Sequence, residues 1–381
     1  MALLYTEDQK SLIDMVHDLC ERELKPHVAE CDKTGITPVE LFDPFFEMGL
    51  HMLEIPEEYG GAGMDYETTA MIFEEIGKYD VGFADTIVTT FVALRNVIQS
   101  GTPEQAQYFA DVIAEGKFAC FAITEPGAGS DAGALRGTAV PDGKGNYILN
   151  GTKCFATNGE CASLYVAFFK TPEEGITAFL IDRDTPGFSI GAHEDKMGFR
   201  MSNTTDLIFE DVVVPESRIV GVKGQGLKVA LNGLNVSRAF IATMGVGLMQ
   251  RALDEAVKYA KVRVQFGKPI IKQQLVQALL ADMAILTETS RCLVNNTMKM
   301  IDAGMNVRKE GSIVKAFVTE AMQEVTAKAI QVFGGYGYSR EYPVEKLYRD
   351  ARIFTIFEGT NEIQRETIAK ALDREYEKYM N

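Results

Sequence analysis

A carboxylate on a glycine turn is the feature of this sequence best suited to chemistry. Glu358 lies in the segment Phe357-Glu358-Gly359-Thr360-Asn361-Glu362, directly before an expected helix that Thr360 or Asn361 would cap. A carboxylate on such a turn is mobile enough to act in catalysis. The helix dipole alone also favours a surface glutamate at a helix N-terminus, and without further context this second interpretation is preferred.

A glycine-rich segment, Thr124-Glu125-Pro126-Gly127-Ala128-Gly129-Ser130-Asp131, follows an expected strand. Proline removes a backbone donor there, and two glycines let the backbone approach a ligand closely. Gly127, Gly129 and Ala132 match the dinucleotide-binding spacing G-x-G-x-x-A, but no long helical stripe follows, so a Rossmann site is rejected. No Gly-Lys-Ser/Thr follows, which excludes a Walker A loop. A ligand loop and a structural turn are equally supported.

A second glycine-rich segment, Gly334-Gly335-Tyr336-Gly337-Tyr338, ends an expected helix that contains Gln331. Glycine at this place can be a helix C-cap or a point where the backbone touches a cofactor, and in isolation the C-cap is favoured. Arg263, Phe266 and Gln274 can likewise be ordinary helix and loop residues. Alone, none of these residues identifies a function.

Composition narrows the class of protein. The chain has 381 residues, 46% hydrophobic and 24% charged, which is ordinary for a globular protein of two or three domains. A net charge of −16 opposes binding to a nucleic-acid backbone. Six cysteines without a C-x-x-C pair indicate reduced thiols, and four histidines without zinc-site spacing predict no metal site. The N-terminus shows no signal peptide and no apolar run is long enough for a membrane span, so we expect a cytoplasmic protein without membrane insertion.

The helices expected first along the chain begin at recognisable caps. Apolar residues recur at helical spacing up to residue 116. Three threonines stand three residues before a Glu or Gln, as a capping box requires: Thr6 before Gln9, Thr37 before Glu40 and Thr102 before Gln105. We therefore expect three helix starts within an N-terminal helical domain, residues 1–116.

From about Phe118 the pattern changes to short runs separated by Gly, Asp, Asn and Pro. The expected strands are Phe118–Thr124, Tyr147–Asn150, Leu164–Phe169, Thr177–Ile181 and Leu207–Val214. Helical spacing returns after Gly226, over segments near 226–260, 272–303 and 311–333 and in a final helix after Thr360, which is typical of a helical bundle. The predicted fold is α+β and mostly α, with a middle β domain at 117–225 and a C-terminal helical bundle domain at 226–381.

Six segments in this order resemble the motifs of the acyl-CoA dehydrogenase family, over essentially the whole chain. They are Phe121–Asp131, Asn150–Asn158, Gly198–Ser202 leading into Val212–Pro215, Arg263–Gly267, Gln331–Gly335 and Phe357–Thr360. Six ordered matches are hard to obtain by chance. The resemblance implies the acyl-CoA dehydrogenase fold, in which a helical domain, a β domain and a four-helix bundle follow one another, together with FAD and a homotetramer.

By this resemblance Glu358 is the catalytic base. It would remove the pro-R α-proton of an acyl thioester while the β-hydrogen leaves as hydride to flavin N5. The backbone N–H of the glutamate and a flavin ribityl hydroxyl would polarise the thioester oxygen as negative charge develops. Ser237 stands beside Arg238, where some relatives place their base, so the base is expected on the turn at Glu358.

The resemblance also implies which residues meet the cofactor and the CoA thioester. Residues expected to bind FAD, partly across a subunit interface, are Phe121, Ile123, Thr124, Ser130, Phe155, Thr157, Arg263, Phe266, Gln274, Gln331, Val332, Phe333, Gly334, Gly335, Thr360 and Glu362. Residues expected to bind the substrate are Ser130, Asn235, Arg238, Gly359, Asp85 and Thr89. Phe155 replaces the tryptophan that is common in relatives.

The expected acyl pocket is polar. Asp85, Thr86, Thr89 and Thr90 would lie near the end of the acyl chain, which favours a short, branched or alicyclic group over a long alkyl tail. Phe83 lies where a glutaryl-type enzyme would need an arginine. We expect oxidation with electron-transferring flavoprotein as the acceptor. The alternatives are an enoyl-CoA reductase, an acyl-CoA oxidase and a non-catalytic helical scaffold.

Overall fold

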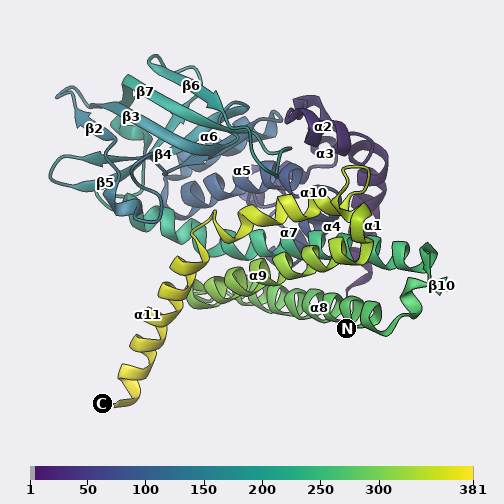
Figure 1. Ribbon diagram of the computed structural model, residues 1–381. Coiled ribbons are helices and arrows are strands. Elements are labelled where there is room, and N and C mark those ends of the chain that lie inside the picture. The colour runs from purple at the N-terminus through teal and green to yellow at the C-terminus, as the bar shows by residue number, and fades with distance from the viewer. Residues whose placement is uncertain (1–4, 381) are drawn as a thin grey trace.

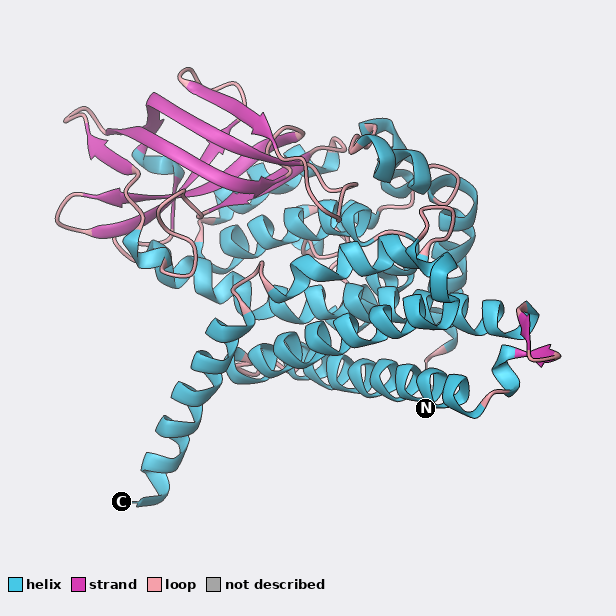
Figure 2. Ribbon diagram, in the orientation of Figure 1, coloured by secondary structure: helices cyan, strands magenta, loops and turns pink. Residues whose placement is uncertain are grey.

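The computed structural model describes residues 5–380 and has three regions that follow one another along the chain (Figure 1). Helices form the first region, strands the second and long helices the third (Figure 2). This order matches the change of period in the sequence. The α+β, mostly α fold class is confirmed.

The first region consists of helices joined by short turns. They are α1 (Glu7–Leu19), a π-helical segment (Cys20–Leu24), α2 (Val28–Thr34), α3 (Asp43–Glu47), α4 (Tyr66–Tyr79), α5 (Val81–Ser100) and α6 (Pro103–Ala114). Two of the expected capping boxes are confirmed. The Thr6 hydroxyl accepts from the Gln9 N–H at 3.1 Å, and the Thr102 hydroxyl accepts from the Gln105 N–H at 3.3 Å. Local hydroxyl caps therefore begin α1 and α6.

The capping box expected at Thr37 is wrong. A short 3₁₀ helix, Val39–Phe42, begins after Pro38, and no side chain caps it. The Thr37 hydroxyl instead donates to the Met201 carbonyl at 2.9 Å. A tertiary contact with a distant loop therefore takes the group that the local pattern assigned to a cap.

One eight-stranded sheet forms the second region, with the strand order β6-β7-β3-β2-β4-β5-β8 and with β1 added parallel to β4. The strands are β1 (Phe118–Ala122), β2 (Thr138–Pro141), β3 (Asn146–Thr157), β4 (Ala162–Thr171), β5 (Gly175–Asp182), β6 (Phe188–His193), β7 (Thr204–Pro215) and β8 (Ile219–Val220). All five expected strands are present. The turn between β2 and β3 is closed by Asp142 Oδ1, which accepts from the Lys144 and Asn146 N–H groups at 2.7 and 3.0 Å.

Long helices that lie side by side form the third region (Figure 1). They are α7 (Gly226–Val262), α8 (Gln274–Asp302) and α9 (Arg308–Phe333), followed by α10 (Val344–Ala351) and α11 (Asn361–Met380). A two-stranded hairpin, β9 (Val264–Gln265) and β10 (Lys268–Pro269), joins α7 to α8. The last helix, α11, points away from the other helices.

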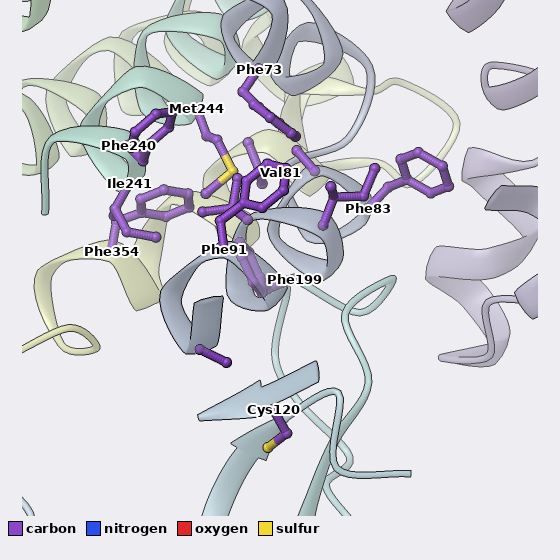
Figure 3. Packing of buried hydrophobic residues seen from close by; sticks show 14 of the residues in the cluster. Phe73, Val81, Phe83, Phe91, Cys120, Phe199, Phe240, Ile241, Met244 and Phe354 are labelled. Atoms are coloured by element: carbon purple, nitrogen blue, oxygen red, sulfur yellow. The ribbon is translucent and has the colours of Figure 1, made fainter. Parts of the chain in front are cut away.

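Helix α5 lies at the centre of the molecule, packed against α4, α7 and β1. It is long and apolar enough to cross a membrane, but 94% of its most apolar stretch is buried inside the protein, as in a core helix. Aromatic rings from several elements meet around it, including Phe73, Phe91 and Phe240 (Figure 3). Burying each such ring contributes roughly 1.5–3 kcal/mol. This rigid centre positions the residues of α5 and α7 that face Glu358.

Candidate active site

The turn that carries Glu358 has an unusual backbone. It links a 3₁₀ helix, Arg352–Thr355, to α11. Glu358 has a φ of +57° and Gly359 a φ of +85°, so two consecutive residues are left-handed. For a residue with a Cβ this conformation costs on the order of 1–3 kcal/mol, and such strain concentrates at functional sites. The surroundings must therefore hold the turn in place.

Two buried side chains hold the carbonyl groups of the turn. Lys315 Nζ, from α9, donates to the Gly359 carbonyl at 2.8 Å. Gln364 Nε2, from α11, donates to the Gly359 and Glu358 carbonyls at 2.9 and 3.2 Å. Both side chains are buried. The sequence analysis missed both residues. The available signal was a lysine on a face of α9 that otherwise carries apolar and small residues.

Burial and nearby charges act on the carboxyl group of Glu358. Its Oε2 atom is buried and has no hydrogen-bond partner among the described residues. Burial raises the pKa of this carboxyl, while the Arg238 guanidinium, the Ser237 hydroxyl and the Lys315 ammonium oppose the rise. A desolvated carboxylate with a raised pKa is a better proton acceptor than one in water.

Arg238 and Asn235 lie together one turn apart on α7, as the sequence predicts. Arg238 is buried, and its Nη1 donates to Asn235 Oδ1 at 3.1 Å and to Ser312 Oγ at 3.3 Å. Its Nη2 lies 4.0 Å from the position that a Cβ on Gly359 would occupy. The guanidinium therefore lies beside the turn that carries Glu358, and its charge favours the ionised form of that carboxyl group.

A second buried carboxyl, Asp85 of α5, faces the same region. Burial and the negative charge of Glu358 raise the pKa of Asp85 to about 8. The Thr89 hydroxyl lies 3.5 Å from Asp85 Oδ2. The hydroxyls of Thr86 and Thr90 donate to carbonyls one turn earlier in α5. All four polar residues expected here are buried, and each threonine hydroxyl donates to a group one turn earlier in the helix.

Strands β1 and β3 bring the first glycine-rich segment beside Phe155. The Cys154 N–H donates to the Thr124 carbonyl at 2.9 Å. A bulge in the pairing of β3 with β7 lies between Lys153 and Ala156, and there Phe155 has a φ of +54° and 65% of its surface exposed. Phe121, Ile123, Thr124 and Thr157 are half-buried around it, and Ser130 is exposed. All six expected residues belong to β1, to β3 or to the segment that follows β1.

A second group of expected cofactor residues lies at the C-terminal ends of α7 and α9. A cavity of about 490 Å³ is lined by Arg263 and the run from Val332 to Gly335. The guanidinium carbon of Arg263 lies 5.4 Å from the centre of the Tyr336 ring, over its face. Phe266, at the tip of the β9–β10 hairpin, is 94% exposed. Gln274, at the start of α8, and Gln331, in the last turn of α9, are also exposed.

Figure 1 shows the β9–β10 hairpin and the sheet at opposite ends of the molecule. The single chain therefore does not bring Phe266 to Phe155. Thr360 and Glu362 lie elsewhere again, at the start of α11. The Thr360 hydroxyl accepts from the Ile363 N–H at 3.4 Å as an N-cap, and Glu362 is exposed.

Family models match nearly the whole chain. The acyl-CoA dehydrogenase N-terminal domain matches residues 6–117, the middle domain residues 120–212 and the C-terminal domain residues 224–372. The chain belongs to the acyl-CoA dehydrogenase family. It is an oxidoreductase of a family of flavoproteins.

Among curated relatives, the short-chain specific acyl-CoA dehydrogenase of Megasphaera elsdenii is 40% identical over 94% of this chain and 96% of its own. The acryloyl-CoA reductase (NADH) of Anaerotignum propionicum is 39% identical over 96% and 94%. The cyclohexane-1-carbonyl-CoA dehydrogenase of Syntrophus aciditrophicus is 37% identical over 98% of both. This acyl-CoA dehydrogenase is thus similar to relatives whose acyl groups are short or compact.

Solved structures show the same fold. Butyryl-CoA dehydrogenase from Megasphaera elsdenii has a TM-score of 0.94 at 38% identity and covers 98% of this acyl-CoA dehydrogenase and 100% of its own chain. A chain in the structure of the electron transferring flavoprotein of Acidaminococcus fermentans has a TM-score of 0.94 at 39% identity, with 98% and 99% covered.

Proposed function

We propose that this acyl-CoA dehydrogenase binds FAD and oxidises a short, branched or alicyclic acyl-CoA to its 2-enoyl-CoA, with Glu358 as the base. The observation that carries the proposal is the buried Oε2 of Glu358, which has no hydrogen-bond partner among the described residues. A buried acceptor without a partner is costly unless a ligand supplies one. An acyl α-carbon presents a proton to such a group.

The residues present fit a flavin dinucleotide. Phe155 offers an exposed aromatic face, and Cβ atoms added at Gly127 and Gly129 would meet nothing within 4 Å, so a ligand backbone contact has room there. Arg263 and the open backbone at Gly334 and Gly335 suit a pyrophosphate and a nucleoside. When bound, FAD supplies the acceptor for the β-hydride.

The elements that carry the two groups of cofactor residues, the sheet and the β9–β10 hairpin, lie at opposite ends of the molecule. Residues 121–157 would hold the flavin ring, and Arg263, Phe266, Gln274 and residues 331–335 would hold the adenosine end of a cofactor bound to a partner subunit. A homotetramer would bring the two groups together. Thr360 and Glu362 would contact the cofactor beyond the base.

The chemistry of the chain's own residues is a proton abstraction. Glu358 takes the α-proton, the electron pair left on the α-carbon becomes the α,β double bond, and the β-hydrogen leaves as hydride. The Glu358 N–H donates to no backbone carbonyl among residues 5–380. It is therefore free to donate to the thioester oxygen, where negative charge develops.

Two polar side chains of helix α5 support a short or compact acyl group. Asp85 and Thr89 place polar atoms in a buried wall that a long alkyl chain would leave unsatisfied. Relatives named for short-chain and cyclohexane-carbonyl substrates support this reading. Ser130, Asn235, Arg238 and Gly359 would meet the thioester and the CoA arm.

The electron acceptor is proposed to be electron-transferring flavoprotein. The structural likeness to a chain in an electron transferring flavoprotein structure supports this choice. A cytoplasmic location and the boundaries at 116/117 and 225/226 stay predictions.

Reduction of an enoyl-CoA is the second candidate direction. A relative named as an acryloyl-CoA reductase, 39% identical, favours it. The same residues serve both directions, because a base that removes the α-proton also returns it. The cellular electron supply decides the direction.

An anaerobic titration tests the proposal. The FAD-loaded protein is mixed with saturated acyl-CoAs of C4 to C16 chain length, isobutyryl-CoA and cyclohexanecarbonyl-CoA, and the flavin absorption is followed. We expect bleaching with a long-wavelength band, at the lowest concentration for a short or compact acyl group. A maximum at palmitoyl-CoA contradicts the size assignment, and a protein that none of them bleaches contradicts the oxidation. Peroxide formation as fast as dye reduction indicates an oxidase instead.

A further inference from the structure

We propose that Lys315 is a positioning residue for the turn that carries Glu358. It holds the Gly359 carbonyl, so that Glu358 keeps its left-handed conformation and its carboxyl group stays ionised. This inference rests on the proposed role of Glu358 as the base. It adds a residue from another helix, 43 positions earlier in the chain, to the machinery of the reaction.

The geometry ties Lys315 to both ends of the turn. Its Nζ donates to the Gly359 carbonyl at 2.8 Å and to Asn361 Oδ1 at 2.9 Å. Asn361 is itself fixed, because its Nδ2 donates to Thr319 Oγ1 at 3.0 Å. The ammonium group therefore joins α9, the turn and the first residue of α11 in one buried network.

A purely structural contact would not need a charge. Both partners of Lys315 are neutral oxygen atoms, and no carboxylate among residues 5–380 lies within ion-pair distance of its Nζ. Burying an ammonium group without an ion pair is costly. A neutral donor, such as the Gln364 amide that binds the same carbonyl, would close the turn without that cost. The positive charge of Lys315 is therefore not needed to close the turn, and we look for its role in the neighbouring carboxyl group.

The charge acts on the base. The positive charge of Lys315 favours the ionised form of Glu358, as does that of Arg238. In return, burial lowers the pKa of Lys315 to about 7, while the negative charges of Glu358, Glu362 and Glu320 favour its protonated form and that of Arg238 opposes it. Lys315 and Glu358 therefore stabilise each other's charged forms in a site with little water.

The test compares three variants in the FAD-loaded enzyme. Lys315→Met removes the charge and both hydrogen bonds with little change of volume, and Lys315→Gln keeps a neutral donor. Lys328→Met makes the same change on the same helix, where Lys328 contacts Asp282 and Glu324 at the surface. The readouts are FAD content, affinity for an enoyl-CoA, and the anaerobic rate of flavin reduction, kred, across pH 5.5–9.

For Lys315→Met we expect full FAD, enoyl-CoA affinity within about threefold of wild type, and a kred lowered at least 30-fold. Below about pH 7, where wild-type Lys315 holds its proton, the rising limb of kred should move to higher pH, because Glu358 loses a charge that lowers its pKa. Lys315→Gln should show the same shift with a smaller loss, and Lys328→Met should match wild type. A kred within threefold of wild type overturns the inference, as does a loss without any shift of the limb. If Lys315→Met does not fold, the same two results for Lys315→Gln decide.

A crystal structure of Lys315→Met separates this inference from the proposed function. If acyl-CoAs bleach the flavin of neither the wild-type enzyme nor any variant, the proposed function is wrong. The turn is still testable, since we expect Glu358 to leave the left-handed region without the ammonium group. An unchanged turn overturns the positioning role whatever the activity.

Discussion

Lys153 and Glu125 form a buried ion pair, with Nζ 2.6 Å from Oε1, that joins strand β3 to the glycine-rich segment after β1. The same carboxylate accepts from the N–H groups of Arg136 and Gly137 at 2.6 and 3.0 Å. Burial alone would raise the pKa of Glu125, but these hydrogen bonds and the Lys153 charge hold it below its usual value. The pair thus fixes the segment that is proposed to meet the flavin.

Replacing Lys153 by Met should destabilise this segment strongly. Removing one partner of a buried pair leaves the other charge unpaired, which costs about 3–5 kcal/mol. We expect a lower Tm in thermal unfolding and weaker retention of FAD on gel filtration. Lys170→Met, an exposed lysine on β4, is the control. Equal Tm values for the two variants would show that the pair contributes nothing.

The ion pair also predicts a pH dependence. Because the pKa of Glu125 is lower in the folded state than in the unfolded state, its stabilisation is present above the unfolded pKa and is lost as the pH falls through the folded one. The gap in Tm between wild type and Glu125→Gln should therefore narrow in acid. A gap that stays constant from pH 7 down to about pH 3 would contradict this origin.

Asp85 predicts the opposite pH dependence to Glu125, because folding raises its pKa. The folded-state pKa of Asp85, about 8, lies above that of an unfolded aspartate, so between these values the unfolded state holds fewer protons and stability falls as pH rises. The amide cannot ionise and removes this loss. We expect Asp85→Asn to have a higher Tm than wild type at pH 8 and nearly the same Tm at pH 4. Identical Tm profiles would show that Asp85 titrates normally.

Helices α4 and α7 cross at glycines. A Cβ on Gly247 would lie 2.2 Å from the Glu74 carbonyl oxygen. A Cβ on Gly245 would come closest to the flexible end of the Met322 side chain, at 2.8 Å, and to the Val318 side chain at 3.6 Å. Gly247→Ala must therefore move backbone and should cost several kcal/mol, more than the usual 1–3 kcal/mol of an overpacked core. Gly245→Ala, two residues away on the same helix, should cost less. Urea unfolding compares the two, and the reverse order would contradict the packing.

The sequence predicted elements well where the signal is local. The strands from Phe118 to Val214 and the starts of α1 and α6 have their own turn and cap residues. Strands β2, β6 and β8 were not predicted: β2 and β8 are short, and β6 and β8 lie at the two ends of the strand order. The capping box expected at Thr37 is absent because the Thr37 hydroxyl donates to a loop far along the chain.

The site was only partly predictable. Glu358, Arg238 and Asn235 were named because the chain resembles an ordered series of family motifs, and their roles stay predictions. Lys315 and Gln364 were missed, because only the tertiary fold brings Lys315 to a turn 43 residues away.

The role of Glu358 as the base is tested most directly by the anaerobic kred of Glu358→Gln with the acyl-CoA that bleaches wild type best. The amide is nearly isosteric and cannot accept the proton. We predict full FAD content, acyl-CoA binding still visible as a shift of the flavin spectrum, and a kred lowered by about 10²–10⁴-fold. A Glu358→Gln enzyme that reduces its flavin at a rate near that of wild type would contradict the account.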